Sequence, residues 1–95
     1  MNAVETIKNI LASEIFVEIP PSQMNVNDSL RDVFGLDSLG FVELRVQCED
    51  MFGITISDDD FSPENFSTIS NVVALVQRLV EASGQGVPAA SGRDS

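Results

Sequence analysis

The spacing of apolar residues predicts three amphipathic helices. The first covers about residues 3–17 and ends before Pro20, because proline lacks the N–H that a helix needs. The second covers about residues 38–52 and ends at Gly53, since glycine tolerates the left-handed conformation common at helix ends. The third ends near Ala82. The expected core-facing residues are, helix by helix, Val4, Ile7, Ile10, Leu11 and Phe16; Phe41, Leu44, Cys48, Met51 and Phe52; and Val72, Val73, Leu75, Val76, Leu79 and Val80.

The connection over residues 20–37 is too apolar for a free linker. We expect it to lie over the helices, with a short helical turn at residues 29–33, and a loop this long in a small domain is often functional. Its apolar residues are Met24, Val26, Leu30, Val33, Phe34 and Leu36.

The connection between the second and third helices is shorter and more polar. Residues 54–56 are extended by propensity but make only a weak strand, and residues 61–66 suit a short, irregular helical turn. Ser67 or Ser70 is expected to cap the third helix. The whole pattern predicts one domain over residues 1–82, followed by a disordered tail over residues 83–95.

The second helix carries more apolar surface than one core-facing stripe requires. At about 100° per residue, Leu39, Val42 and Val46 fall opposite the core-facing side. Around them lie Glu43, Glu49 and Asp50. Such an apolar patch with an acidic rim is typical of a transient docking surface. The alternative is that residues 20–36 cover the three apolar side chains.

The charge balance limits the classes of partner. The 95 residues contain fifteen acidic and five basic side chains, for a net charge of −10. Nucleic acid and anionic membranes are disfavoured as partners, because both are bound mainly through Lys and Arg. A basic protein surface is the natural complement, unless the acids serve only to keep the domain soluble.

Few residues are available for catalysis or metal binding. The chain has no histidine and one cysteine, so histidine-based nucleophilic sites, Cys/His metal sites and an intramolecular disulfide are excluded. Cys48 is expected to be a buried small hydrophobe. The acids Asp58, Asp59 and Asp60 lack the glycine and distal glutamate of a calcium loop, so no metal is expected. The chain shows no secretory signal, its Met1 favours a free-standing protein, and a cytoplasmic location is the default expectation.

One serine stands at the start of the second helix. Either Asp37 or Ser38 can cap this helix through a side-chain oxygen. A helix start also favours a phosphate, because its free N–H groups point at the anion. Ser38 could therefore carry a phosphate ester, although on local grounds a simple cap is the more economical interpretation.

The order of several motifs resembles that of the acyl carrier protein family. The resemblance covers about residues 3–82 and rests on four segments: Leu30 followed by Phe34-Gly35-Leu36-Asp37-Ser38-Leu39; Val42-Glu43-Leu44 with Glu49-Asp50-Met51-Phe52; Ile54-Thr55-Ile56-Ser57-Asp58-Asp59; and Phe66-Ser67-Thr68-Ile69.

The resemblance implies an all-α four-helix bundle, with three longer helices, one short helix and a long first loop. It implies a 4′-phosphopantetheine arm on Ser38, flanked by Asp37 and Leu39, installed from coenzyme A by a phosphopantetheinyl transferase. The carrier itself would be non-catalytic and monomeric, and would present thioesters to acyltransferases or ketosynthases. The implied partner-binding residues are Leu39, Val42, Glu43, Val46, Glu49, Asp50, Asp58 and Asp59.

Some positions depart from the pattern of fatty-acid carriers. Gly40 stands where an acid is frequent, Arg45 adds a positive charge, and the segment from Asp60 to Phe66 is slightly longer. These departures favour a discrete carrier of polyketide biosynthesis or extender-unit supply, such as one holding a three-carbon acyl unit. The alternatives are a fatty-acid carrier, a non-covalent acidic interaction domain with Ser38 as a cap, and a carboxylate enzyme.

Overall fold

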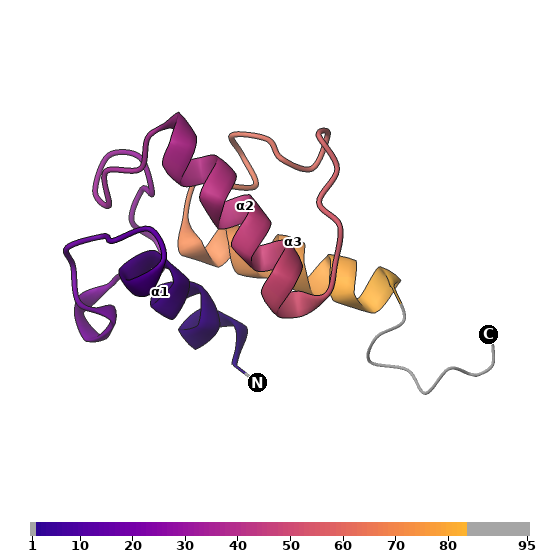
Figure 1. Cartoon of the computed structure of the whole chain (residues 1–95), viewed down its shortest axis with the longest axis horizontal. Coiled ribbons are helices and arrows are strands. Elements are labelled where there is room, and N and C mark those ends of the chain that lie inside the picture. Colours follow the sequence, from indigo (N-terminus) through magenta and orange to yellow (C-terminus); the bar gives the residue numbers. More distant parts are fainter. Residues whose placement is uncertain (1, 84–95) are drawn as a thin grey trace.

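A computed structural model describes residues 2–83 of the chain. Within that range the elements are α1 (Ala3–Ser13), the 3₁₀ turn η1 (Pro21–Gln23), α2 (Ser38–Phe52) and α3 (Ile69–Ala82) (Figure 1). The all-α prediction is confirmed over these residues, and none of their helices is long and apolar enough to cross a membrane. Residues 84–95, most of the predicted tail, lie outside the described residues.

Each α-helix begins at a side-chain cap. Asn2 accepts hydrogen bonds from the N–H groups of Val4 and Glu5 at the start of α1. Thr68 caps α3 by accepting from Asn71 N–H at 3.1 Å. The predicted caps Ser67 and Ser70 were wrong: the Ser67 hydroxyl donates to Glu64 C=O, and Ser70 N–H bonds Val26 C=O.

The first helix is shorter than predicted. It ends at Ser13, and Phe16 adopts a left-handed conformation with φ 63°, so the chain reverses before it reaches Pro20. The side chain of Phe16 is 78% exposed, which corrects the expectation that it faces the core. The helical spacing of apolar residues continues past Ser13, although the helix itself ends there. No glycine follows Ser13 to indicate this helix end in the sequence.

The core lies where α1 packs on α3 and, less extensively, on α2, and where α2 crosses α3 (Figure 1). Its buried residues on the helices include Ile7, Ile10, Leu11, Leu44, Cys48, Ile69, Val72, Val73, Leu75 and Val76. The predicted stripe of α3 is thus confirmed, with Leu79 and Val80 half-buried against it. Met51 is a correction, because it is 49% exposed at the open groove between Phe52 and α3.

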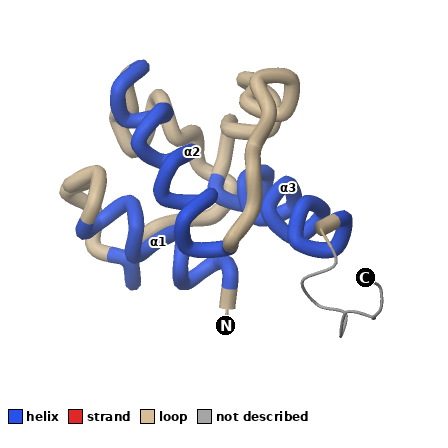
Figure 2. Tube along the Cα trace, turned by 45° about the vertical axis from the view of Figure 1, so that its right-hand side comes forward, coloured by secondary structure: helices blue, strands red, loops and turns tan. Residues whose placement is uncertain are grey.

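Figure 2 shows the long connections as loops beside the helices, one of which rises above α3. Met24, Leu30, Phe34 and Leu36 are buried in the core, as predicted for the first connection. A single helical turn closes from Val33 N–H to Ser29 C=O at 2.9 Å. Ser29 also forms an isolated antiparallel bridge with Thr68, which attaches the first loop to the start of α3.

The fourth helix implied by the family resemblance is not confirmed. Residues 57–66 form two separate turns, closed by Phe61 N–H to Ser57 C=O and Phe66 N–H to Ser62 C=O. Pro63 lacks an N–H, and the hydroxyls of Ser57 and Ser62 accept the N–H groups of Asp60 and Asn65. Local side-chain bonds of this kind compete with helix propagation. Residues 54–56 form no strand.

Candidate functional site

Ser38 is the first residue of α2 and is exposed. Asp37 is the cap, because its Oδ1 accepts a hydrogen bond from Gly40 N–H at 2.8 Å. Of the two residues that could cap this helix, Asp37 does so. The Ser38 hydroxyl has no hydrogen-bond partner among residues 2–83, so the fold leaves it free for chemistry.

The backbone on either side of Ser38 depends on two glycines, Gly35 and Gly40. Gly35 has φ 77°, a left-handed conformation that strains any residue with a Cβ. The following Leu36 is buried and anchors the chain to the core. A Cβ on Gly40 would lie 3.2 Å from Leu36 Cγ, so glycine here gives Leu36 the room to pack against the first turn of α2. The departure at Gly40 thus has a local packing consequence.

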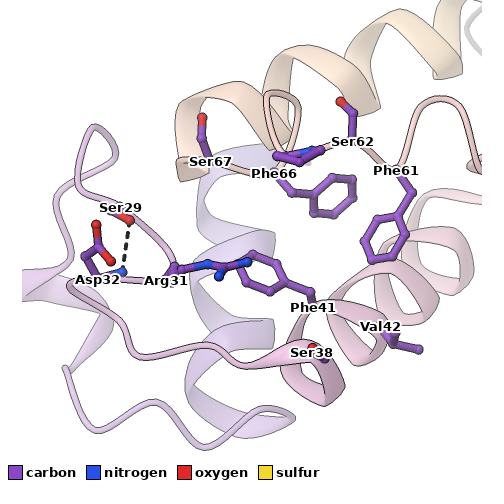
Figure 3. A pocket seen from close by; sticks show the side chains of 11 residues that line it. Ser29, Arg31, Asp32, Ser38, Phe41, Val42, Phe61, Ser62, Phe66 and Ser67 are labelled. Atoms are coloured by element: carbon purple, nitrogen blue, oxygen red, sulfur yellow. Dashed lines mark hydrogen bonds between the residues drawn. The ribbon is translucent and has the colours of Figure 1, made fainter.

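A pocket of about 390 Å³ opens beside Ser38 (Figure 3). Three aromatic rings line it: Phe41 from α2, and Phe61 and Phe66 from the connection to α3. Phe61 and Phe66 meet edge to face with ring centroids 4.9 Å apart. The remaining lining residues are polar or lie at the rim: Ser29, Arg31, Asp32, Ser38, Val42, Ser62, Pro63 and Ser67.

Arg31 is the unusual charge of this pocket. Its guanidinium lies over the Phe41 ring, 5.8 Å from the centroid, while the neighbouring Asp32 points the opposite way (Figure 3). Every other basic side chain among residues 2–83 pairs with a carboxylate: Lys8 with Glu5, Arg45 with Asp58, and Arg78 with Asp60. Arg31 forms no ion pair within that range. The pocket beside Ser38 therefore combines aromatic walls with a guanidinium that forms no ion pair within the described residues.

These residues fit a 4′-phosphopantetheine group. A free serine hydroxyl is the attachment chemistry, a guanidinium suits a phosphodiester, and aromatic walls with hydroxyl rims suit the chain of amides and methyl groups that follows. Arg31, Phe61 and Phe66 were not recognised as site residues from the sequence. They stand 7 residues before and 23 and 28 residues after Ser38, so no local motif joins them.

The outer side of α2 is open to solvent. Leu39, Val42 and Val46 are 80%, 49% and 41% exposed, so residues 20–36 do not cover them. On the opposite side Leu44 and Cys48 are fully buried, and Phe41 and Phe52 are half-buried. As predicted, α2 has one apolar side buried in the core and a second apolar side exposed to solvent.

The acids predicted to lie around that face or to bind partners differ in their contacts within the fold. Glu43 accepts a hydrogen bond from Gln47, and Asp50 and Asp59 are exposed. Glu49 is partly used by the fold, because its Oε2 accepts the N–H of Ile56 at 2.8 Å. Asp58 lies 3.1 Å from Arg45.

Arg45 joins α2 to the loop that follows it. Its Nε donates to the Ile56 carbonyl at 3.1 Å, its Nη2 donates to the same oxygen, and its guanidinium lies 4.9 Å from the Phe61 ring centroid. Phe61 lines the pocket beside Ser38, so Arg45 also positions one of its walls.

The acids and the single cysteine are the remaining candidates for metal binding or nucleophilic chemistry. Among residues 2–83 no group of three or more His, Cys, Asp or Glu side chains could hold a metal ion. Cys48 is buried, and burial, with a smaller contribution from Glu49, raises the pKa of its thiol from 9.0 to about 12. A thiol with that pKa stays protonated at neutral pH and is a poor nucleophile.

The fold and the site together define a small helical domain with an exposed serine at the start of its second α-helix. The model of the phosphopantetheine attachment site family matches residues 5–76. The chain is 39% identical over 66 residues to an acyl carrier protein of Rhodococcus erythropolis, which covers 70% of this chain and 69% of the relative. It is 37% identical over 71 residues to the meromycolate extension acyl carrier protein of Mycolicibacterium aurum, covering 75% and 71%.

A third relative has a different cargo in its name. The D-alanyl carrier protein of Streptococcus suis is 37% identical over 82 residues, covering 86% of this chain and all of the relative. The chain therefore belongs to the phosphopantetheine-binding acyl carrier protein family, and 4′-phosphopantetheine is its cofactor.

Proposed function

We propose that Ser38 carries the 4′-phosphopantetheine arm and that the protein presents acyl groups to partner enzymes without catalysing their reactions. The observation that carries this proposal is the exposed, unbonded Ser38 hydroxyl at the edge of a pocket with an unpaired Arg31. When attached, the arm supplies a terminal thiol that holds acyl groups as thioesters. Arg31 would face the phosphodiester, and Phe61 and Phe66 would offer apolar contact to the chain behind it.

The test of attachment is the intact mass after incubation with coenzyme A and a broad-specificity phosphopantetheinyl transferase. The wild-type protein gains the mass of one arm, and peptide mapping places it on Ser38. Ser38→Ala gains nothing, and its melting temperature stays near the wild-type value, because Asp37 provides the cap. Ser62→Ala is the matched control, since Ser62 lines the same pocket and the variant should still load. An arm on another serine would refute the assignment.

The outer side of α2 is the proposed docking surface for the transferase and for acyltransferases or ketosynthases. Leu39, Val42 and Val46 supply exposed apolar area, and Glu43 and Asp50 supply negative charge beside it. Glu49, Asp58 and Asp59 extend the acidic surface toward the next loop, although Glu49 and Asp58 also bond within the fold. Exposed charges act mainly on association rate, so loading should slow as salt rises.

For the pathway, we propose polyketide biosynthesis or the supply of an extender unit. The supporting features are Gly40, Arg45 and the longer segment between Asp60 and Phe66, at which the chain departs from fatty-acid carriers. The named roles of the relatives, meromycolate extension and D-alanyl carriage, belong to those proteins. The holo protein should therefore accept a three-carbon unit from an extender-unit acyltransferase faster than a long chain from a fatty-acyl ligase. The reverse order would contradict this pathway.

A further inference from the structure

Phe16 combines a strained backbone with an exposed apolar side chain. It is the single non-glycine residue among residues 2–83 with a positive φ, at 63°, and its side chain is 78% exposed. A left-handed residue after a helix is usually glycine or asparagine, because a bulky side chain is strained there. Burial of the ring would offset that strain, but the ring is not buried. The fold alone therefore gives no reason for a phenylalanine at this position.

The ring lines a groove that reaches the candidate attachment site. We define the Phe16 groove as the cavity of about 680 Å³ between the end of α1, the first loop and the first turn of α2. Phe16, Val33 and Leu39 line it, and these are three of the six large apolar side chains exposed among residues 2–83. Leu39 directly follows Ser38, and Asp37, which directly precedes it, lines the groove too.

The charge around the groove has one sign. Its four charged lining residues are Glu14, Glu18, Asp37 and Glu43, and no lysine or arginine is among the lining residues. Arg31 lines the other pocket beside Ser38 and not this one. The groove therefore complements a surface that presents an apolar side chain flanked by lysine or arginine.

We propose that the Phe16 groove is a docking surface for the enzyme that modifies Ser38, and that Phe16 becomes buried in that contact. The inference rests on the proposed attachment at Ser38. An enzyme that reaches the Ser38 hydroxyl covers its two neighbours, Asp37 and Leu39, and both belong to the groove. The docking surface then extends from α2 across to the end of α1, and its occupant is a basic protein surface with an apolar contact residue.

The experiment measures loading by a broad-specificity phosphopantetheinyl transferase, with kcat and KM for the carrier determined separately. The variants are Phe16→Gly and Phe16→Asn, since both residues adopt a left-handed conformation without strain and only the first adds backbone freedom. Each should raise KM about tenfold with kcat unchanged, the size expected for losing one buried aromatic contact. Each should also raise or preserve the melting temperature, because the strain of a bulky residue in the left-handed conformation is removed.

Met51→Ala is the matched control. Met51 is 49% exposed and lies in a different groove, between the end of α2 and α3. The KM of the transferase for the Met51→Ala carrier should therefore equal its KM for the wild-type carrier. Wild-type KM in both Phe16 variants would overturn the proposal. So would a rise in KM accompanied by a lower melting temperature in both, since Phe16 would then serve the fold. A wild-type protein that gains no arm at all would instead refute the attachment at Ser38.

Discussion

Replacing Arg45 with methionine should loosen the loop after α2 and destabilise the whole domain. Arg45→Met keeps most of the aliphatic stem and removes the guanidinium. That group donates from Nε and Nη2 to the Ile56 carbonyl, pairs with Asp58 at 3.1 Å and lies over Phe61. Ile56 itself is fully buried, so its carbonyl has little access to water once the donors are gone.

The size of the effect follows from these contacts. A hydrogen bond from a charged donor contributes about 1.5–3 kcal/mol, and the two donors share one acceptor, so they count once. The ion pair adds less than about 1 kcal/mol, because the Asp58 side chain is 96% exposed. The cation–π contact with Phe61 adds about 0.5–1 kcal/mol. Since contacts of one side chain are not additive, the expected loss is about 2–4 kcal/mol.

Urea unfolding of Arg45→Met, Asp58→Asn and Arg78→Met measures the loss and assigns it. Arg78→Met is the matched control, because Arg78 is well exposed and lies 3.9 Å from Asp60, so it should cost less than about 0.5 kcal/mol. Asp58→Asn should also cost less than about 0.5 kcal/mol. Equal losses in Arg45→Met and Arg78→Met would refute the reasoning. A loss in Asp58→Asn as large as that in Arg45→Met would assign the stabilisation to the ion pair instead.

Two further predictions concern α2. Leu44→Ala should destabilise the domain by about 2–5 kcal/mol, whereas Val46→Ala, at a site 41% exposed, should cost well under about 1 kcal/mol yet slow loading; equal losses in urea unfolding would place Val46 in the core. Because the pKa of Cys48 is raised from 9.0 to about 12, the unfolded chain loses this proton first as pH rises. Stability should therefore fall by about 1.4 kcal/mol per pH unit within that window, a slope that Cys48→Ala should remove. The chain has no tyrosine, so few other groups titrate there.

The bounds of α2 could be predicted from the sequence because both of its end signals are local. Asp37 caps the start of the helix by accepting a hydrogen bond from the N–H of Gly40, three residues later. Gly53 ends the helix in a left-handed conformation with φ 66°. The end of α3 and the burial of the first loop could also be predicted, because the positions of the apolar residues were sufficient to indicate both. The end of α1 could not be predicted, because Phe16 takes a conformation that its residue type disfavours.

The sequence also pointed to Ser38, since its flanking residues and the acidic helix behind it lie within one continuous segment. The rest of the site depends on tertiary structure. Arg31, Phe61 and Phe66 meet beside Ser38 for two reasons. The Ser29–Thr68 bridge joins the first loop to the start of α3, and the hydrogen bonds that Arg45 and Glu49 form with the backbone of Ile56 hold the second connection against α2. Periodicity places a residue on one side of a helix, but it does not say which loop will lie against it. Which loop lies against a helix depends on long-range packing. The same packing pairs the other basic side chains of residues 2–83 with carboxylates and leaves Arg31 without an ion pair.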